Sequence, residues 1–522
     1  MADTRTRKRR HELPILATVA TAVSDPGAAA AASGNGMQDY LRIGVITLGC
    51  DKNTVDTERL LARLAGAGVR LAADANDADV VIVNTCGFID AAREESIDTI
   101  LETVRLKTEG RIRAVVAMGC LVQRYKAELA AEIPEVDLFL GLTEVERLVP
   151  ELRARGIVPS AAAAPTMERT LRLLSTVSHH SSYLKVSEGC DHTCAFCAIP
   201  LMRGKHRSTP MAQLVREARE LEEQGVIELN LVSQDTTWYG RDSARGVVSD
   251  KAEFFVGRTF QGMAGIASPD PVMRRARGEA DPAGLLPDLL RALLDGTGIP
   301  WFRLFYMYPS GIRPELVELM AREPRILPYL DMPIQHGSDA VLARMRRPER
   351  RATILERVAW LRAALPDVTL RTTVIVGFPG ETEEDFEALL NLLEQVRFDR
   401  LGAFPYSSEG DTPAATMDGQ VSDAVKRERM ERLLELQRSI TAERAEGWVG
   451  REAEILIDRV VGRESAMRGR DVRGAVGRTV GQAPEVDGVV HVREVDGITP
   501  GDLVRVRITA ALEEDLEGEL LS

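Results

Sequence analysis

Short apolar runs rich in β-branched residues alternate with helical patterns over the first third of the chain. They occupy residues 41–48, 79–84 and 114–118, and each has the length of a β-strand. Between the first two runs, Thr57 to Leu64 carries Leu60 and Leu61 at helical spacing and is followed by two glycines. Strands that alternate with helices predict a parallel, flavodoxin-like α/β domain.

A second series of strand-like runs begins near the middle of the chain, separated by helical stretches such as Met211 to Gln224 and Pro314 to Arg322. The runs are residues 183–187, 226–232, 301–307, 327–334, 369–376 and 401–406. About six β/α units predict a partial TIM-type (β/α)6 barrel with its site at the C-terminal ends of the strands.

The last part of the chain has a different pattern. A helical segment from Ser422 to about Gly447 precedes short strand-like runs at 453–457, 489–492 and 503–508, which predict a small C-terminal β-barrel. We therefore expect a disordered extension over residues 1–38, an α/β domain over 39–157, a linker over 158–178, a barrel core over 179–446 with an insertion at about 241–284, and a final barrel over 447–522.

The net charge favours some partners over others. The chain has 522 residues, with 79 Asp and Glu against 66 Lys and Arg and a formal net charge of -13. Binding to a phosphate backbone depends largely on Lys and Arg, so an acidic chain has no strong electrostatic reason to bind nucleic acid. A basic protein partner suits this charge better.

Three of the six cysteines, Cys190, Cys194 and Cys197, form a compact motif directly after the run at 183–187. Thiolates suit iron-sulfur clusters, zinc or cuprous copper, and a loop with three of them can wrap one corner of a cluster. Three ligands would leave one iron of a four-iron cluster open for a small molecule. The alternative is a zinc site with His192 as the fourth ligand. The position of the loop after a strand favours the cluster, because cofactor loops lie there in barrel and open-sheet enzymes.

The other three cysteines, Cys50, Cys86 and Cys120, each follow a predicted strand of the first domain and stand beside a glycine. Because ligands bind at the carboxyl ends of parallel strands, we expect these thiols to converge on another cluster. The alternative is three unrelated buried cysteines, since free Cys often behaves as a small core hydrophobe. We call these residues the first triplet, and Cys190, Cys194 and Cys197 the second triplet. Neither set resembles a disulfide framework.

The first 38 residues run from a basic segment through an apolar stretch into an alanine-rich one, an order that superficially resembles a signal peptide. Pro14, Thr18 and Thr21 interrupt the apolar stretch, however, and a cluster enzyme that needs reduction belongs in the cytoplasm. No run of apolar residues is long enough to span a membrane. We expect a cytoplasmic protein.

The second triplet resembles the cysteine loop of the radical S-adenosylmethionine superfamily, in which an aromatic residue, here Phe196, precedes the last cysteine. From residue 41 to about 518 the chain resembles the methylthiotransferase family, which joins an N-terminal cluster domain, a radical S-adenosylmethionine barrel and a C-terminal TRAM domain. The resemblance implies a 4Fe-4S cluster on each triplet, with S-adenosylmethionine on the open iron of the second. Candidate contacts of S-adenosylmethionine are Phe196, Ser233, Gly377 and Gly380.

Five segments resemble the RimO branch of this family, which acts on ribosomal protein S twelve. They are residues 48–53, 84–89, 233–236, 331–336 and 483–488. The tRNA-modifying branch usually has Gln-Met-Asn after its first cysteine, where this chain has Asp51-Lys52-Asn53, and Asp51 also departs from the Pro or Ser often found in the ribosomal branch. From residue 451 onward, ten Lys and Arg stand against fifteen Asp and Glu, a composition that repels RNA and attracts a basic ribosomal protein.

The resemblance implies an enzyme that methylthiolates the β-carbon of a specific aspartate in ribosomal protein S twelve. A deoxyadenosyl radical would abstract hydrogen from that carbon, and sulfur carried at the first triplet's cluster, methylated by another S-adenosylmethionine, would be transferred to it. The reaction implies an electron donor such as flavodoxin or ferredoxin, no membrane and no direct contact with nucleic acid. Three alternatives stay open: methylthiolation of a tRNA adenosine, an iron-sulfur scaffold or electron carrier, and a zinc-bearing interaction protein.

The segment from Gly377 to Thr382 has two interpretations. Gly377 and Gly380 would allow a cofactor to approach the backbone closely, but the segment is equally typical of a strand-to-helix turn capped by Thr382. For His336 we expect a structural hydrogen-bonding role rather than that of a catalytic base. No catalytic residue is predicted beyond the cluster ligands.

Overall fold

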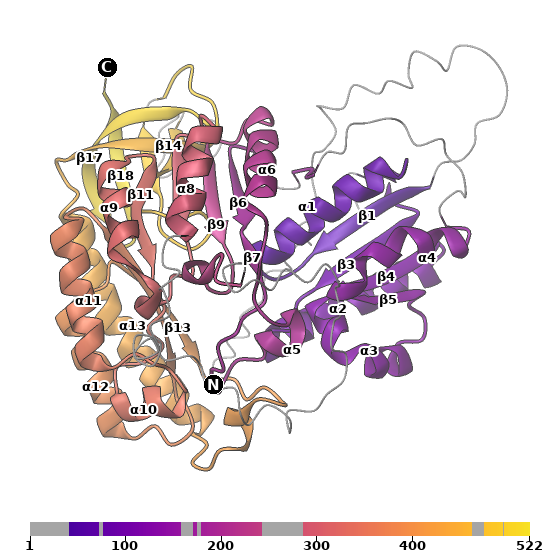
Figure 1. Cartoon of the computed structure of the whole chain (residues 1–522), viewed down its shortest axis with the longest axis horizontal. Coiled ribbons are helices and arrows are strands. Elements are labelled where there is room, and N and C mark those ends of the chain that lie inside the picture. Colours follow the sequence, from indigo (N-terminus) through magenta and orange to yellow (C-terminus); the bar gives the residue numbers. More distant parts are fainter. Residues whose placement is uncertain are drawn as a thin grey trace, which may run out of the picture. The chain divides into compact units, whose positions relative to one another are not determined.

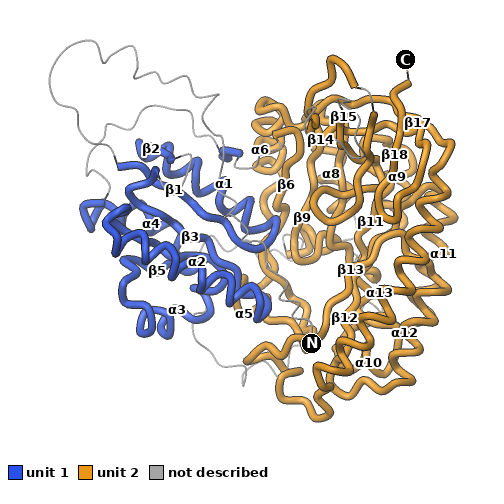
Figure 2. Tube along the Cα trace, turned by 180° about the vertical axis from the view of Figure 1, so that it is seen from behind, with its two compact units in different colours: residues 1–177 blue, residues 178–522 orange. Residues whose placement is uncertain are grey.

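The computed structural model describes residues 41–72, 77–157, 171–174, 179–242, 285–461, 474–493 and 495–521. The predicted N-terminal extension, most of the predicted linker and almost all of the predicted insertion lie outside the described residues. The chain divides into two compact units, unit 1 over residues 1–177 and unit 2 over residues 178–522, coloured blue and orange in Figure 2.

The described part of unit 1 is built on a five-stranded parallel sheet in the order β2-β1-β3-β4-β5 (Figure 1). This is the strand order of flavodoxin-like folds, so the predicted fold class is confirmed. The strands are β1 (Arg42–Thr47), β2 (Arg70–Leu71), β3 (Val80–Thr85), β4 (Ala114–Gly119) and β5 (Leu138–Gly141). The helices are α1 (Asp51–Gly66), α2 (Asp90–Thr108), α3 (Cys120–Glu132), the 3-10 helix η2 (Leu142–Arg147) and α4 (Leu148–Ala154).

The central strands of unit 1 are buried on both faces, which explains why they read as continuous apolar runs. Val81 and Val83 of β3 belong to the apolar cluster that includes residues of α2 and α3. Val80 and Ile82, which point the other way, belong to the cluster formed with α1 and α4. The sheet is therefore a middle layer between two pairs of helices.

Helix α1 differs from the prediction at its start. It begins at Asp51, directly after Cys50, whereas the sequence pattern placed the first helical residue at Thr57. The first turn contains Lys52 and Asn53, which are buried although they are polar. Apolar periodicity gives no sign of a helix in such a turn. The short strands β2 and β5 were also missed.

The larger sheet of unit 2 has six parallel strands in the order β13-β12-β11-β10-β9-β6. Neighbours in the sheet follow one another along the chain, as the predicted partial (β/α)6 barrel requires. The strands are β6 (Ser181–Lys185), β9 (Glu228–Val232), β10 (Trp301–Leu304), β11 (Ile326–Asp331), β12 (Thr369–Val376) and β13 (Arg400–Pro405). The α-helices are α5 (Ile199–Arg203), α6 (Met211–Glu223), α8 (Leu285–Gly296), α9 (Pro314–Arg322), α10 (Asp339–Arg344), α11 (Arg351–Ala364), α12 (Glu383–Val396) and α13 (Asp423–Glu446). The short elements are the antiparallel pair β7 (Ser187–Glu188) and β8 (Arg207–Ser208), and the 3-10 helices η3 (Thr236–Trp238), η6 (Pro309–Gly311) and η7 (Pro413–Thr416).

Two strands of this sheet end earlier than their apolar runs. The run at 301–307 continues beyond Leu304, and the run at 327–334 continues beyond Asp331. Tyr306, within the first of these runs, has a positive φ angle of 56°, so the backbone turns there before the run is finished. Gln335, directly after the second run, has a φ of 70°. These turns lie at the C-terminal ends of the strands, where a barrel of this type places its site.

The described C-terminal residues form the predicted small barrel, closed in the order β14-β15-β16-β18-β17. Its strands are β14 (Glu452–Val461), β15 (Gly474–Thr479), β16 (Val490–Arg493), β17 (Leu503–Leu512) and β18 (Asp515–Leu520). The sequence pattern missed β15 and β18. Strand β15 contains Gly474 and Gly477, and β18 contains three acidic residues, so neither forms an apolar run.

Buried charges attach this barrel to the N-terminal ends of the parallel strands. Glu228, the first residue of β9, is fully buried and accepts hydrogen bonds from Arg303 Nε at 2.9 Å and Ser181 Oγ at 2.8 Å. Arg478 of β15 lies 2.7 Å from Glu228 Oε2 and donates from Nε to Asp458 at 2.8 Å. Burial by itself would raise the pKa of Glu228, but Arg478 and Arg303 outweigh it and lower the pKa to about 2.

The loop at 483–488, one of the five family-like segments, makes a second attachment. The Asp487 carboxylate accepts hydrogen bonds from Tyr329 Oη at 2.8 Å and from the Ala483 backbone N–H at 2.9 Å. Arg371 lies 3.6 Å from Asp487 and 3.2 Å from Asp331, and so joins the loop to β11 and β12. The C-terminal barrel is therefore attached at Glu228, the first residue of β9, and also along β11 and β12.

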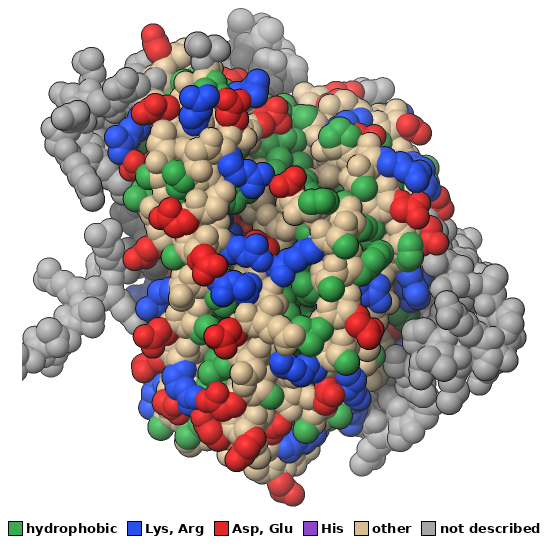
Figure 3. All heavy atoms as spheres, turned by 90° about the vertical axis from the view of Figure 1, so that its left-hand side faces the viewer, with side chains coloured by type: hydrophobic (Ala, Val, Ile, Leu, Met, Phe, Trp, Pro, Cys, Tyr) green, Lys and Arg blue, Asp and Glu red, His purple; other side chains and the backbone are tan. Residues whose placement is uncertain are grey.

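Figure 3 shows one face of the molecule, on which acidic and basic side chains are interspersed over most of the surface. Among the described residues, no helix is both long and apolar enough to cross a membrane.

We expect replacement of Glu228 by Gln to destabilise unit 2 strongly, because it leaves two buried guanidinium groups without their shared carboxylate. Breaking a buried ion pair by removing one partner costs about 3–5 kcal/mol. Because folding lowers the pKa of Glu228, the carboxylate stabilises the fold at pH values above its ordinary pKa of 4.5, and this stabilisation is lost as the pH falls toward about 2. Thermal unfolding should show that the difference in stability between wild type and Glu228→Gln becomes smaller as the pH falls over that interval.

Glu318→Gln provides the matched control. Glu318 forms an exposed ion pair with Arg322, and exposed pairs contribute about 0–1 kcal/mol. Equal effects of the two substitutions at neutral pH would contradict a stabilising role for the buried carboxylate.

Candidate functional site

The second triplet lies on an irregular loop between β7 and α5, at the C-terminal edge of the six-stranded sheet. Because the loop has no regular structure, bonds to other segments hold its backbone. Cys190 N donates to Gly204 O at 3.0 Å, Ala195 N donates to Met345 O at 3.0 Å, and Ala195 O accepts from Ala414 N at 2.9 Å. Segments far apart in the sequence therefore fix the positions of the three cysteines.

The three thiols of this loop influence one another electrostatically. Burial raises the pKa of Cys190 well above its ordinary value, and negative charge on Cys197 and Cys194 raises it further. Burial and the charge of Cys194 also raise the pKa of Cys197 to about 12. Thiols grouped in this way ionise when a cationic centre offsets the charge of the thiolates, and binding to that centre releases their protons.

Three thiols on one loop are soft ligands of the kind that iron-sulfur clusters take. In the part of the chain that the structure describes, no three His, Cys, Asp or Glu side chains are grouped closely enough to hold one ion. The three thiols are near enough for Cys194 and Cys197 to raise the pKa of Cys190. His192, the alternative zinc ligand, has its Nε2 atom 2.7 Å from Asp235 Oδ2.

Two residues that sequence analysis missed surround Cys194. The Tyr308 hydroxyl lies 3.0 Å from Cys194 Sγ, and Arg347 Nη1 donates to the same sulfur at 3.9 Å. Tyr308 follows β10 and Arg347 follows α10. The only signal for Tyr308 is its place near the C-terminal end of a strand; Arg347 lies in no motif.

The predicted contacts of S-adenosylmethionine occupy different local environments. Phe196 packs against the apolar cluster that contains Ala195 and Phe378, which fastens the cysteine loop to the turn after β12. Ser233 is fully buried beside Thr236, with 3.4 Å between their hydroxyl oxygens. Their role in binding S-adenosylmethionine stays a prediction.

Gly377 and Gly380 have positive φ angles of 72° and 73°, which favour glycine. A Cβ atom at Gly377 would collide with the Lys426 side chain, and one at Gly380 would collide with the Arg344 guanidinium. The close approach at these glycines is therefore made by the chain's own side chains. Contact with a cofactor is likewise still a prediction.

The segment that follows is a capped turn of the predicted type. The Thr382 side chain accepts a hydrogen bond from the Asp385 backbone N–H at 3.2 Å, and the Asp385 carboxylate accepts one from the Thr382 backbone N–H at 3.1 Å. His336 is fully buried, its Nδ1 atom accepts from the Ser338 backbone N–H at 3.0 Å, and its Nε2 atom lies 3.4 Å from Glu381. Its structural role stays a prediction.

Gln234 follows strand β9, beside Ser233 and Asp235. The structure gives neither its amide oxygen nor its amide nitrogen a hydrogen-bond partner, although both atoms are buried. Such a group is costly to leave unsatisfied in a folded protein. Its amide is therefore a candidate contact for a bound molecule.

The first triplet lies at the carboxyl edge of the unit 1 sheet. Cys50 precedes α1, Cys86 follows β3, and Cys120 is the first residue of α3. Cys50 is exposed, whereas Cys86 and Cys120 are buried. Because β1, β3 and β4 are neighbours in the sheet, the structure brings the three segments together as expected, although ligation of a cluster stays a prediction.

Asn53 connects all three of these segments. Its Nδ2 donates to Leu48 O at 2.8 Å and to Thr85 O at 3.1 Å, and its Oδ1 lies 3.8 Å from Cys120 Sγ. The side chain is fully buried. Sequence analysis quoted Asn53 only as part of a motif, because no periodicity or composition signal identifies a residue that bridges strand ends.

Asp51 forms an ion pair with Lys52 at 3.3 Å, and both side chains are almost buried. Asp51 is the residue that departs from the family pattern. Its carboxylate offsets the charge of Lys52 beside the first triplet, a role that neither Pro nor Ser could fill.

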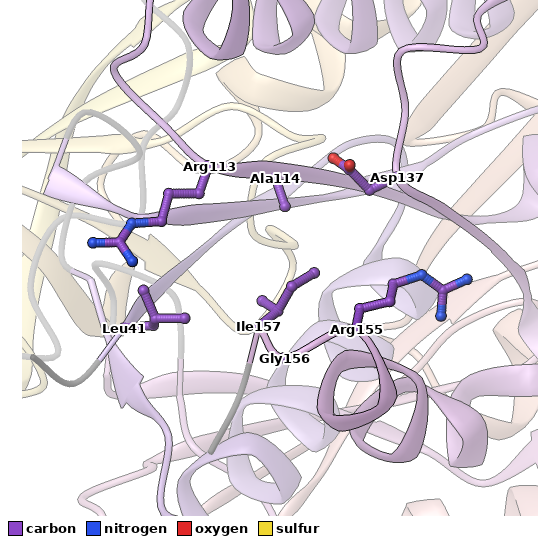
Figure 4. Close-up of a pocket in the computed structure, with 7 residues that line it drawn as sticks. All are labelled: Leu41, Arg113, Ala114, Asp137, Arg155, Gly156 and Ile157. Atoms are coloured by element: carbon purple, nitrogen blue, oxygen red, sulfur yellow. The ribbon is translucent and has the colours of Figure 1, made fainter. Parts of the chain in front are cut away.

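A cavity of about 460 Å³ lies at the opposite edge of the unit 1 sheet (Figure 4). Its lining residues are Leu41, Arg113, Ala114, Asp137, Arg155, Gly156 and Ile157. Arg113 and Arg155 extend toward opposite sides in Figure 4, and Asp137 is engaged by Lys107 at 2.7 Å. The cavity contains none of the predicted site residues.

Three family models match the chain, one after another along the sequence. The uncharacterized protein family UPF0004 matches residues 42–141, the radical SAM superfamily matches residues 184–393, and the TRAM domain matches residues 449–521. The first match includes the whole first triplet, and the second includes the whole second triplet.

Curated relatives are similar over almost the whole chain. The ribosomal protein uS12 methylthiotransferase RimO of Anaeromyxobacter sp. (strain Fw109-5) is 44% identical over 486 residues, which cover 92% of this chain and 93% of the relative. The RimO proteins of Symbiobacterium thermophilum and Geobacter sulfurreducens are 42% and 39% identical, each over 92% of this chain and over 91% and 99% of the relative.

Among solved structures, the radical S-adenosylmethionine methyltransferase TsrM from Kitasatospora setae, with cobalamin and a [4Fe-4S] cluster bound, is similar with a TM-score of 0.46. It is 12% identical, and the match covers 72% of this chain and 77% of that one.

We expect Gly49→Ala to destabilise unit 1 and displace Cys86. Gly49 has a φ of 95°, and a Cβ atom there would lie 2.7 Å from Cys86 Cβ and 2.8 Å from its sulfur. The left-handed conformation alone costs a non-glycine residue about 1–2 kcal/mol, and the collision adds to this cost. Thermal unfolding and the alkylation rate of Cys86, followed by peptide mapping, would measure the two effects.

Gly110→Ala separates the two costs. Gly110 also has a positive φ, 74°, but an added Cβ would meet nothing within 4 Å. This control should lose stability through the backbone alone and leave the reactivity of Cys86 unchanged. Equal losses of stability in the two variants would mean that the contact with Cys86 does not matter.

Proposed function

The chain belongs to the family of radical S-adenosylmethionine methylthiotransferases that includes these RimO proteins, and from this premise we propose that it methylthiolates the β-carbon of a specific aspartate in ribosomal protein uS12. The observation that carries the proposal is the 44% identity with such a relative over 92% of the chain. That similarity spans most of both units rather than a single shared domain.

The second triplet would hold a 4Fe-4S cluster whose remaining iron binds S-adenosylmethionine. When bound, the pair supplies a deoxyadenosyl radical that can take hydrogen from a carbon that acid-base chemistry cannot reach. The chain's own part is to hold three thiolates in place and to exclude water. Ala195 of the loop packs with Val341, Met345 and Phe378 in a buried apolar group, which is suited to this task.

The contacts proposed for S-adenosylmethionine itself are Phe196, Ser233, Gly377 and Gly380, together with the Gln234 amide. Gln234 is the addition that the structure supports, because its buried oxygen and nitrogen have no hydrogen-bond partner among the residues that the structure describes. A methionine or adenine group could satisfy both atoms.

The first triplet would hold another 4Fe-4S cluster, at which the sulfur to be transferred is carried. Asn53 supports this assignment, because one buried amide ties the segments of all three cysteines together. Ser96 adds to the support by bonding to both the N–H and the carbonyl of Cys86, at 3.0 and 2.8 Å. Such bonds would fix the cysteines at the separation that a cluster needs.

A basic ribosomal protein suits the C-terminal barrel better than RNA does. Arg478, which could have contacted phosphate, is instead buried against Glu228 and Asp458. Arg505 and Arg507 on its surface both pair with Glu452. We therefore propose a cytoplasmic enzyme that recognises protein, receives electrons from a donor such as flavodoxin or ferredoxin, and makes no direct contact with nucleic acid.

The proposal is tested with full-length protein reconstituted without oxygen. The protein is incubated with dithionite, S-adenosylmethionine and uS12, and the uS12 is analysed by mass spectrometry with fragmentation. We expect a mass gain equal to SCH3 replacing H on one aspartate.

Three other results would redirect the assignment. Unchanged uS12 with deoxyadenosine formed, and modified tRNA in a parallel reaction, would favour the tRNA substrate. A full iron content without any deoxyadenosine would favour a scaffold or electron carrier. Zinc in place of iron after purification without oxygen would overturn the cluster assignment altogether.

Single cysteine substitutions should separate the two clusters. We expect Cys194→Ala to abolish formation of deoxyadenosine, because it removes a ligand of the cluster that binds S-adenosylmethionine. Cys86→Ala should retain some deoxyadenosine formation but give no methylthiolated product. Thr193→Ala, at an exposed position of the same loop, is the control and should behave like wild type. Fully modified uS12 from the Cys86 variant would rule out the proposed division of labour.

A further inference from the structure

The Tyr308 ring is held between two other side chains. It stacks on the His192 ring with 3.9 Å between centroids and an angle of 5° between planes. The Arg347 guanidinium lies over the Tyr308 ring, 3.8 Å from the ring centroid. Both rotation and translation of the phenol are thereby restricted, so its hydroxyl is aimed rather than free to search for a partner.

Each neighbour of Tyr308 is fixed in turn by a different strand end. His192 Nε2 lies 2.7 Å from Asp235, which follows β9 and caps η3 by accepting from Thr237. Arg347 donates to Pro333 O, which follows β11, at 2.9 Å and pairs with Glu349 at 3.0 Å. The stack therefore joins the cysteine loop to the ends of β9, β10 and β11.

The hydroxyl of Tyr308 points at the sulfur of Cys194. The distance of 3.0 Å is within hydrogen-bond range for a sulfur acceptor, and Arg347 approaches the same sulfur at 3.9 Å. A phenol is protonated at neutral pH, whereas a metal-bound cysteine is a thiolate. Between these two groups the phenol is the donor.

We infer that Tyr308 is a positioning residue that donates a hydrogen bond to Cys194 Sγ and thereby raises the reduction potential of a cluster bound at the second triplet. The inference rests on the proposed function, because it requires that this loop hold the cluster. Reduction adds negative charge to a cluster, and a donor aimed at a ligand sulfur stabilises that charge. The cluster is thus easier to reduce with Tyr308 than without it.

Tyr308→Phe tests the inference, because it removes the hydroxyl and keeps a ring for the stack. Tyr306→Phe removes the same group two residues away and is the matched control. Full-length wild type and both variants are reconstituted without oxygen, and their iron and sulfide contents are compared. The electron paramagnetic resonance signal that changes on addition of S-adenosylmethionine identifies the cluster of the second triplet and is followed during a redox titration.

We expect Tyr308→Phe to shift the midpoint potential of that signal to a more negative value, with iron content retained and Tyr306→Phe unchanged. Electron nuclear double resonance in H2O and D2O gives a second readout. Wild type should show an exchangeable proton coupled to the cluster, and Tyr308→Phe should lack it.

An unshifted potential with the exchangeable proton still present in Tyr308→Phe would overturn the inference. Loss of the cluster from that variant would overturn it as well, because the hydroxyl would then be needed for assembly rather than for tuning. A wild-type protein with no signal sensitive to S-adenosylmethionine would instead defeat the proposed function, so the two failures are distinguishable.

Discussion

Both cysteine sites depend on one constraint, which is that a parallel sheet delivers the carboxyl ends of all its strands to the same edge. In unit 1, Thr47 is paired with Asn84 and Thr85 with Gly119, so the first triplet begins at matched positions along neighbouring strands. Beyond those positions the backbone ladder stops, and side chains must replace it. Asn53 does so in unit 1, and the stack around Tyr308 does so in unit 2.

The difference between strands paired through their backbone and segments held by side chains explains what the sequence could and could not predict. The apolar strands and their parallel arrangement follow from periodicity and agree with the structure. The cysteines of the first triplet follow strands that are neighbours in the sheet, and their convergence on a cluster stays a prediction. Strands β15 and β18 were missed because a closed barrel also accepts strands rich in glycine or acidic residues. Tyr308, Arg347 and Asn53 were missed as parts of the site because their contacts cross between elements distant in sequence, and a single chain shows no local pattern for such contacts.

The C-terminal barrel is also attached through side chains from different strands, which here are charged groups instead of thiols. Glu228 is buried between Arg303 and Arg478, so desolvation is offset only while both arginines are present. Arg478 would otherwise be a surface cation of the kind that binds phosphate. Because Arg478 is buried, it is not a basic group on the barrel surface. Its contact with Glu228 lies at the N-terminal end of β9, at the other end of the strand from the cysteine loop. Arg478 therefore contributes to the attachment of the C-terminal barrel through its ion pairs with Glu228 and Asp458.

Arg347 shows how a buried cation can assist a thiolate site without dominating it. Its side chain is almost fully buried, and Glu349 lies 3.0 Å from it with a carboxylate that is also buried. The pair is close to neutral, so it adds little net positive charge around Cys194. What remains is directional: the guanidinium plane supports the Tyr308 ring, and one N–H faces the sulfur. Because hydrogen bonds act over short distances whereas net charge acts over long ones, these contacts act on the Cys194 sulfur with little change in the electrostatic field over the rest of the loop.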